Sequence, residues 1–203
     1  MARERSTGLS ELAGSGFIEL DQAQQKLANL STQLGLSESN LLDPIGNTQD
    51  PDQCLELLVR LTRDNNPKIQ SIAANQAAFG RLCKVLGASV GLFEFLAREP
   101  AALELFMQEP ALPSAESSLI ALTKAATGVS PIRIAYRQQL LKIAIFDVCS
   151  QDPAGQIGPV SKALADLAAA AIEAGLTLAK AELSDEANQL HFPRQDVSNT
   201  RIA

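Results

Sequence analysis

Apolar residues recur at three- and four-residue spacing along most of this chain, in segments that Pro, Gly and Ser separate from one another. This spacing places apolar side chains on one side of an α-helix, whereas a half-buried strand would alternate apolar and polar residues. The pattern predicts helices near residues 10–13, 21–34, 52–63, 67–86, 90–99, 100–107, 114–127, 131–148 and 159–183. No convincing alternation occurs before the final residues, so the expected fold is an all-α, multi-helix bundle.

Local signals mark several helix ends. Gly35 is suited to end one helix in the left-handed conformation, and Gly87 to end another in the same way. Ser89 and Ser130 are suited to begin the helices that follow them, because a Ser hydroxyl can accept a hydrogen bond from a first-turn N–H group. The segment "NLLDPIGNTQDP", residues 40–51, is expected to be a loop.

The pattern divides the chain into three expected parts. Residues 1–50 form an N-terminal helical and loop segment that is partly labile, because Ser, Gly, Gln and acidic residues leave it few apolar anchors. Residues 51–184 form a helical bundle, and residues 185–203 form a polar loop broken by Pro193.

The stretch "YRQQLLKIAIFDV", residues 136–148, begins as an amphipathic helix and ends almost wholly apolar. Its second half is therefore expected to be buried on several sides. Arg133 and Arg137 lie four residues apart, so their charges point the same way, toward solvent, toward acidic groups of a neighbouring helix, or toward a partner.

The helix at 159–183 has a single polar stripe, and its other residues are small and apolar. Four consecutive Ala residues and Gly175 would let neighbouring helices approach closely. This helix is therefore expected to be the central strut of the bundle, not a site for a cofactor.

The charge and hydropathy of the chain indicate which kinds of molecule it can bind. The chain has 203 residues and a net charge of -6, which disfavours non-specific binding to nucleic acid or to an anionic membrane. The apolar run at 167–172 is far too short to span a bilayer, and the N-terminus lacks the apolar core of a signal peptide. We expect a cytoplasmic protein whose partners are proteins.

Few residues could carry chemistry. Cys54, Cys83 and Cys149 are far apart and flanked by aliphatic residues, as expected of buried thiols in a reducing compartment. His191 has no nearby nucleophile or second His, and the chain contains neither G-x-x-x-x-G-K-[ST] nor G-x-S-x-G. No catalytic, cofactor-binding or metal-binding residue is expected in this chain.

Three blocks of the sequence nevertheless match a known pattern of residues, in the same order and spacing. Residues 81–106 contain an arginine-leucine helix, a Leu-Gly-x-Ser corner and Leu-rich helices bounded by Pro. Residues 160–179 form the long helix, with Leu164, Leu167, Ala168 and Ala171 in matching places. The middle block matches the pattern L-R-x-x-Y-R-R-x-L-L-R-I-A-x-x-D-L at Arg133, Tyr136, Arg137, Leu140, Leu141, Ile143, Ala144 and Asp147. Over roughly residues 54–183, the chain resembles the bifunctional glutamine-synthetase adenylyltransferase and adenylyl-removing enzymes.

The resemblance implies a nucleotidyltransferase that attaches AMP to a tyrosine of glutamine synthetase and removes it phosphorolytically, in two related catalytic domains. It implies ATP and Mg²⁺ as cofactors of the full-length enzyme, and glutamine synthetase and a nitrogen-signalling PII-type protein as its partners. That chemistry needs a Gly-rich turn and a D-x-D on a strand to hold Mg²⁺. The chain has no Gly pair, and no D-x-D follows its long helix. We therefore expect it to be the N-terminal helical part that precedes a nucleotidyltransferase domain, inactive by itself.

The same resemblance suggests a contact surface. Arg133, Arg137 and Lys142 are candidates for contact with a partner or with the adjoining domain. Gln138 and Lys142 stand where the family usually has Arg, which thins the basic face. The alternative interpretation is a self-contained helical adaptor that binds a protein in a groove between helices. A third interpretation is a complete small enzyme, but the motifs of this chain do not provide a pair of nucleophile and base.

Overall fold

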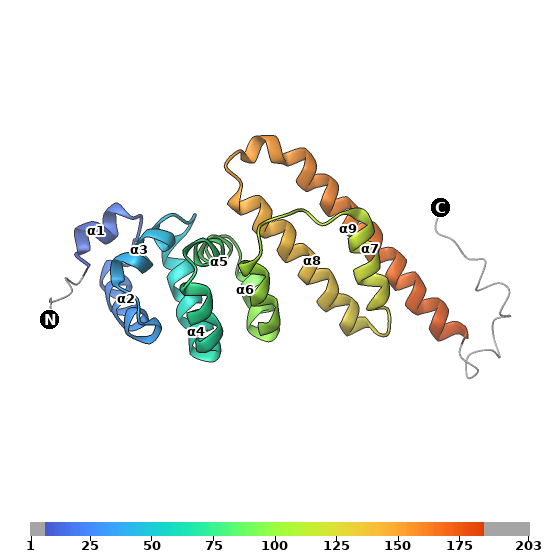
Figure 1. Ribbon diagram of the computed structural model, residues 1–203, viewed down its shortest axis with the longest axis horizontal. Helices are drawn as coiled ribbons and strands as arrows, with labels where there is room; N and C mark the ends of the chain where they lie inside the picture. The colour runs from blue at the N-terminus through green and yellow to red at the C-terminus, as the bar shows by residue number, and fades with distance from the viewer. Residues whose placement is uncertain (1–6, 185–203) are drawn as a thin grey trace. The chain divides into compact units, whose positions relative to one another are not determined.

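Every regular element in residues 7–184, the part that this computed structural model describes, is a helix (Figure 1). The elements are α1 (Leu9–Gly14), α2 (Leu20–Leu34), α3 (Glu38–Gly46), α4 (Pro51–Ala73), α5 (Gln76–Ala88), α6 (Val90–Arg98), the 3-10 helix η1 (Pro100–Met107), α7 (Ala115–Lys124), α8 (Val129–Cys149) and α9 (Pro153–Ser184). The prediction of an all-α fold is confirmed.

The chain forms two compact units. Among the described residues, unit 1 comprises 7–110 with 144–153, and unit 2 comprises 111–143 with 154–184. The helix α8 contributes its first fifteen residues, 129–143, to unit 2 and its last turns to unit 1.

In unit 1, the helix α4 packs against α2, α3, α5, α6 and η1. The core of this unit contains buried leucines from α2, α4 and α5 and one buried Phe each from α5 and η1. The largest fully buried side chains there include Leu27, Leu30, Leu55, Leu58, Leu61, Leu82, Phe79 and Phe106. Removing these aliphatic surfaces from water provides the main stabilisation of this unit.

Residues 7–50 belong to the same unit. The backbone N–H of Ile18 donates to Asp52 Oδ2 at 2.8 Å, and Lys26 pairs with Glu56 at 2.7 Å, so α2 and the segment before it are joined to α4. Leu12 and Leu41 are fully buried. The greater lability of residues 1–50, and the division into 1–50, 51–184 and 185–203, stay predictions; residues 185–203 lie outside the described part.

Several predicted helix ends are confirmed. Gly35 ends α2 with φ of 68°, in the left-handed region where Gly is favoured. The Ser89 hydroxyl accepts from the N–H of Leu92 at 3.2 Å and so begins α6. Ser130 does not cap α8 as predicted, because the helix already begins at Val129 and Ser130 lies in its first turn.

The expected loop at 40–51 was wrong for most of its length, because α3 covers residues 38–46. Ser37 caps this helix by accepting from the N–H of Asn40 at 3.3 Å. Leu41 and Ile45 are fully buried, and their burial outweighs the turn-like residues around Pro44.

The single helix expected at 67–86 is also wrong. The helix α4 continues to Ala73 through a kink at Asn65, whose φ of -134° is not helical. Asn75 then begins α5, because its side-chain oxygen accepts from the N–H of Ala78 at 3.1 Å. Apolar residues continue on both sides of this cap, so their periodicity does not reveal the break between the two helices.

Gly87 does not adopt the predicted left-handed conformation. In residues 7–184, only Gly16 and Gly35 have positive φ, and Gly87 lies inside α5. A Cβ atom at Gly87 would lie 2.7 Å from Thr48 Cβ and 3.3 Å from the Asp50 carbonyl oxygen. Gly is therefore needed here for the close approach of the segment between α3 and α4.

Arg81 joins α5 to the end of η1. Its side chain is only 10% exposed, and its Nε donates to the Phe106 carbonyl at 3.0 Å. Its Nη1 lies 3.4 Å from Glu109 Oε1, but that carboxylate is 90% exposed. The buried hydrogen bond to the carbonyl is therefore the stronger link, since an exposed ion pair contributes little.

In unit 2, the first part of α8 runs antiparallel to α9, and both helices pack with α7 (Figure 1). The core is small: its fully or nearly buried side chains are Leu122, Ile143, Ala163, Leu167, Ala170 and Ala174. Ile132, Tyr136 and Leu140 cover it from α8. Small alanines let α8 lie close to α9, but they bury little apolar surface.

We expect Gly87→Ala to destabilise the chain by about 1–3 kcal/mol, because its Cβ would overlap Thr48. The matched control is Gly80→Ala on the same helix, where no atom lies within 4 Å of the added Cβ. That change should be neutral or stabilising by up to about 1 kcal/mol. Chemical denaturation of both variants checks this, and equal stabilities would contradict the close approach.

Candidate interaction surface

The helix α8 explains the change of character along residues 136–148. Leu141, Ile143 and Ile145 are each at most 3% exposed, so the second half of this stretch is buried as predicted. Tyr136 and Leu140, in the first half, are only partly buried against the core of unit 2. The helix is thus a packing element over most of its length.

Arg133 and Arg137 are both exposed. Among residues 7–184, neither guanidinium group makes a hydrogen bond or an ion pair. Four residues correspond to just over one helical turn, so the two guanidinium groups share one side of α8. Two charges of the same sign on one exposed side suit an acidic partner.

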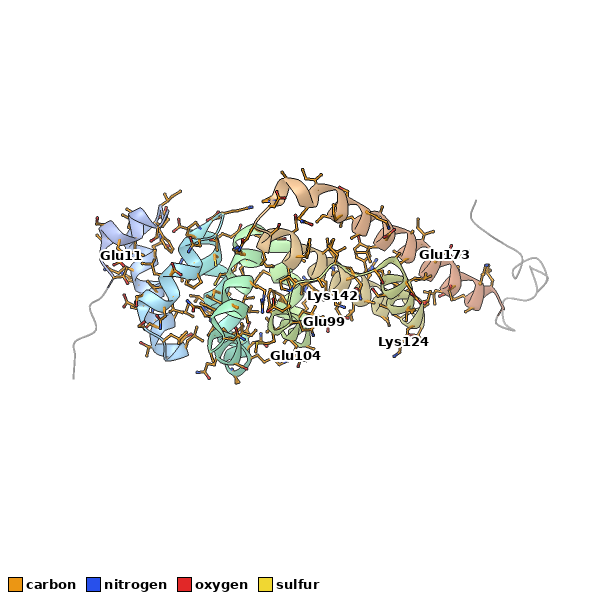
Figure 2. The ribbon with its side chains drawn as sticks, turned by 45° about the horizontal axis from the view of Figure 1, so that its top comes forward. Glu11, Glu99, Glu104, Lys124, Lys142 and Glu173 are labelled. Atoms are coloured by element: carbon orange, nitrogen blue, oxygen red, sulfur yellow. The ribbon has the colours of Figure 1, made fainter. Side chains whose placement is uncertain are left out.

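Lys142 does not extend this side. It lies five residues after Arg137 on α8, which corresponds to about 140° around the helix, and it is half-buried. Figure 2 shows Lys142 on α8 and Glu173 on α9, both within unit 2. The three predicted contact residues therefore form a pair and one separate cation, and their contact role stays a prediction.

An open groove of about 360 Å³ lies beside Arg133. Its walls come from the first turns of α8 and the last turns of α9: Val129, Ile132, Arg133, Gly175, Leu178, Ala179 and Glu182. The lining is mainly aliphatic, with one cationic and one anionic side chain. Glu182 has an interaction of its own, whereas Arg133 has none among the described residues.

Sequence reasoning did not find the α9 side of this groove. Gly175, Leu178 and Glu182 recur at three- and four-residue spacing, which indicates a shared side of the helix. The spacing does not say which helix lies opposite. Only the pairing of α8 with α9 places these residues next to Arg133.

The helix α9 is not the central strut that its composition predicted. Ala163, Leu167, Ala170 and Ala174 face the core of unit 2. Ile157, Leu164 and Ile172 are 67%, 40% and 54% exposed. The polar stripe is present, with Lys162 and Asp166 paired at 2.6 Å. This helix therefore has a buried apolar side, a polar stripe and an exposed apolar side.

The thiols show no feature of reactive cysteines. Cys54 and Cys83 are fully buried. Burial raises the pKa of the Cys83 thiol, and its neighbour Cys54 raises it further. Cys149 is only half-buried, and burial raises its pKa as well. Thiols with raised pKa values stay protonated near neutral pH and are poor nucleophiles.

Within residues 7–184, no three His, Cys, Asp or Glu side chains are grouped so that they could hold a metal ion. In the same range, no helix is long and apolar enough to cross a membrane. His191 lies outside the described residues.

We expect Ile143→Ala to cost about 2–5 kcal/mol of stability, because it leaves a cavity between α8 and the rest of the unit 2 core. Arg137→Ala should cost about 1 kcal/mol or less, since the exposed guanidinium has no ion pair among the described residues. Denaturant melts of the two variants check this. An Ile143→Ala variant as stable as the parent would show that the environment assigned to α8 is wrong.

The whole chain is similar to part of much longer proteins. It is 32% identical, over its full length, to the bifunctional glutamine synthetase adenylyltransferase/adenylyl-removing enzyme of Leifsonia xyli subsp. xyli, of which it covers 21%. It is 34% and 31% identical, over 90% of its length, to the enzymes of the same name from Streptomyces avermitilis and Streptomyces coelicolor, of which it covers 19%.

No family model and no solved structure matches the chain. It spans about a fifth of the length of the curated relatives it matches. Even so, the similarity extends from one end of the sequence to the other in the first of these relatives. The chain belongs to the family of the bifunctional glutamine synthetase adenylyltransferase/adenylyl-removing enzymes.

Proposed function

We propose that this chain is a helical, non-catalytic part of an enzyme that attaches AMP to glutamine synthetase and removes it again. The observation that carries the proposal is a match along 90% or more of the chain that covers only about a fifth of each relative. The described part of the chain then provides packing surfaces and contacts, and the reacting groups come from elsewhere in a longer polypeptide.

Several finer points follow from the family resemblance. The longer enzyme would use ATP and Mg²⁺ in the cytoplasm and would bind glutamine synthetase and a PII-type signalling protein. The described residues do not fit Mg²⁺, because no cluster of carboxylates among them could hold a divalent ion. No step of the reaction is therefore assigned to residues 7–184.

The pair Arg133 and Arg137 is the proposed contact surface of this part. Both side chains are exposed and lack an ionic partner among the described residues. The two guanidinium groups have the same sign and lie on one side of α8, which favours an acidic surface on the partner.

We expect the 203-residue chain alone to transfer no AMP to glutamine synthetase in the presence of ATP and Mg²⁺. We expect a chimera of the Leifsonia xyli relative, in which this chain replaces the aligned stretch, to transfer AMP. Incorporation of radiolabelled AMP measures both. Transfer by the isolated chain would show that it contains catalytic groups, and a folded but inactive chimera would contradict the proposed role in this enzyme.

A further inference from the structure

The helix α9 is apolar around more of its circumference than the rest of unit 2 covers. Its buried side faces α7 and α8 through alanines and Leu167. Its outer side presents Leu164, Ala168 and Ile172, all exposed, at successive four-residue steps. A helix that is apolar on nearly all sides is normally buried on nearly all sides. The outer side is therefore a surface that a further element could cover.

Exposed large apolar side chains are concentrated in unit 2. Among the described residues, unit 2 holds seven of them although it is the shorter unit, and unit 1 holds four. Those of unit 2 are Leu119, Ile120, Val129, Ile157, Leu164, Ile172 and Leu183. Leu164 and Ile172 lie on the same outer side of α9, and grouped apolar surface marks contact sites, whereas single exposed residues do not.

The groove beside Arg133 continues this outer side of α9. Gly175 and Ala179 line the groove, and they follow Ile172 at three- and four-residue spacing. Nothing lies within 4 Å of a Cβ atom added at Gly175, so the groove is open above this residue. An aliphatic side chain could enter there, with a carboxylate within reach of Arg133.

We propose that the groove and the outer side of α9 dock a helix from the part of the family polypeptide that lies outside this chain. The docked helix would place an aliphatic side chain over Gly175 and a carboxylate beside Arg133. This proposal rests on the proposed function, because it takes the occupant from the same enzyme. The relatives are about five times as long as this chain, so they contain ample sequence to supply it.

The charges favour this occupant over a second copy of the chain. An interface with twofold symmetry would bring the same surface of both copies together, and the acidic side chain in the described lining of that surface, Glu182, already has an interaction of its own. A different segment can instead place acidic residues opposite Arg133.

Cysteine labelling tests whether the outer side is covered. Ala168→Cys reports on the outer side of α9, and Thr177→Cys on its exposed polar stripe, both in a Cys149→Ser background that removes the half-buried thiol. In the chimera, maleimide should label Cys at 168 at least about ten-fold more slowly than in the 203-residue chain. Labelling at 177 should change by less than about two-fold between the two proteins.

Matched substitutions then test the groove. Gly175→Leu fills it and Arg133→Glu reverses its charge, so each should restore fast labelling at position 168 in the chimera. The controls are Gly158→Leu, on the same helix with equally open space, and Lys124→Glu, the same change of charge at an exposed position of α7. Neither control should restore labelling.

Each outcome supports or overturns the proposal. Equal labelling at 168 in both proteins overturns it, and so does an insoluble chimera, because the proposed surfaces would then not fit each other. Protection that grows with the concentration of the isolated chain assigns the surface to a second copy and also overturns it. If the chimera transfers AMP but position 168 is not protected, the proposed function is supported and the docking is overturned. If position 168 is protected but no AMP is transferred, the docking is supported and the proposed function is overturned.

Discussion

One-sided packing of α9 is the constraint on which unit 2 depends. Ala163, Ala170 and Ala174 allow α8 to lie close to α9, and Leu167, Leu122 and Ile143 fill the remaining space. The same small residues limit how much apolar surface this contact buries. The small residues of α9 therefore explain both the close contact between the helices and the small core of this unit. They also explain why apolar surface remains on the outer side of α9.

Unit 1 is held together by large apolar side chains instead of alanines. Its core uses leucines and phenylalanines around α4, and polar side chains join segments that are distant in sequence. Asp52 accepts from the backbone of Ile18, and Arg81 donates to the Phe106 carbonyl. The second bond satisfies a carbonyl in the last turn of η1, where a helix leaves its C=O groups without partners.

The sequence predicted the helical class and most helix positions because the apolar periodicity is strong. The prediction was wrong where contacts between distant segments determine the local conformation. Buried Leu41 and Ile45 impose a helix on a turn-like segment, and Gly87 is required by Thr48, which lies almost forty residues earlier. The proposed contact surface could be predicted only in part: Arg133 and Arg137 share a side by spacing alone, whereas the groove depends on which helix pairs with α8.

The alanine-rich core of unit 2 has a thermal consequence. Unfolding raises the heat capacity in proportion to the apolar surface that it exposes. A unit whose core includes three alanines among six buried residues exposes little such surface. Its stability curve should therefore be flat, so that cooling weakens it less than it weakens a leucine-rich core, while a covering partner would sharpen the curve.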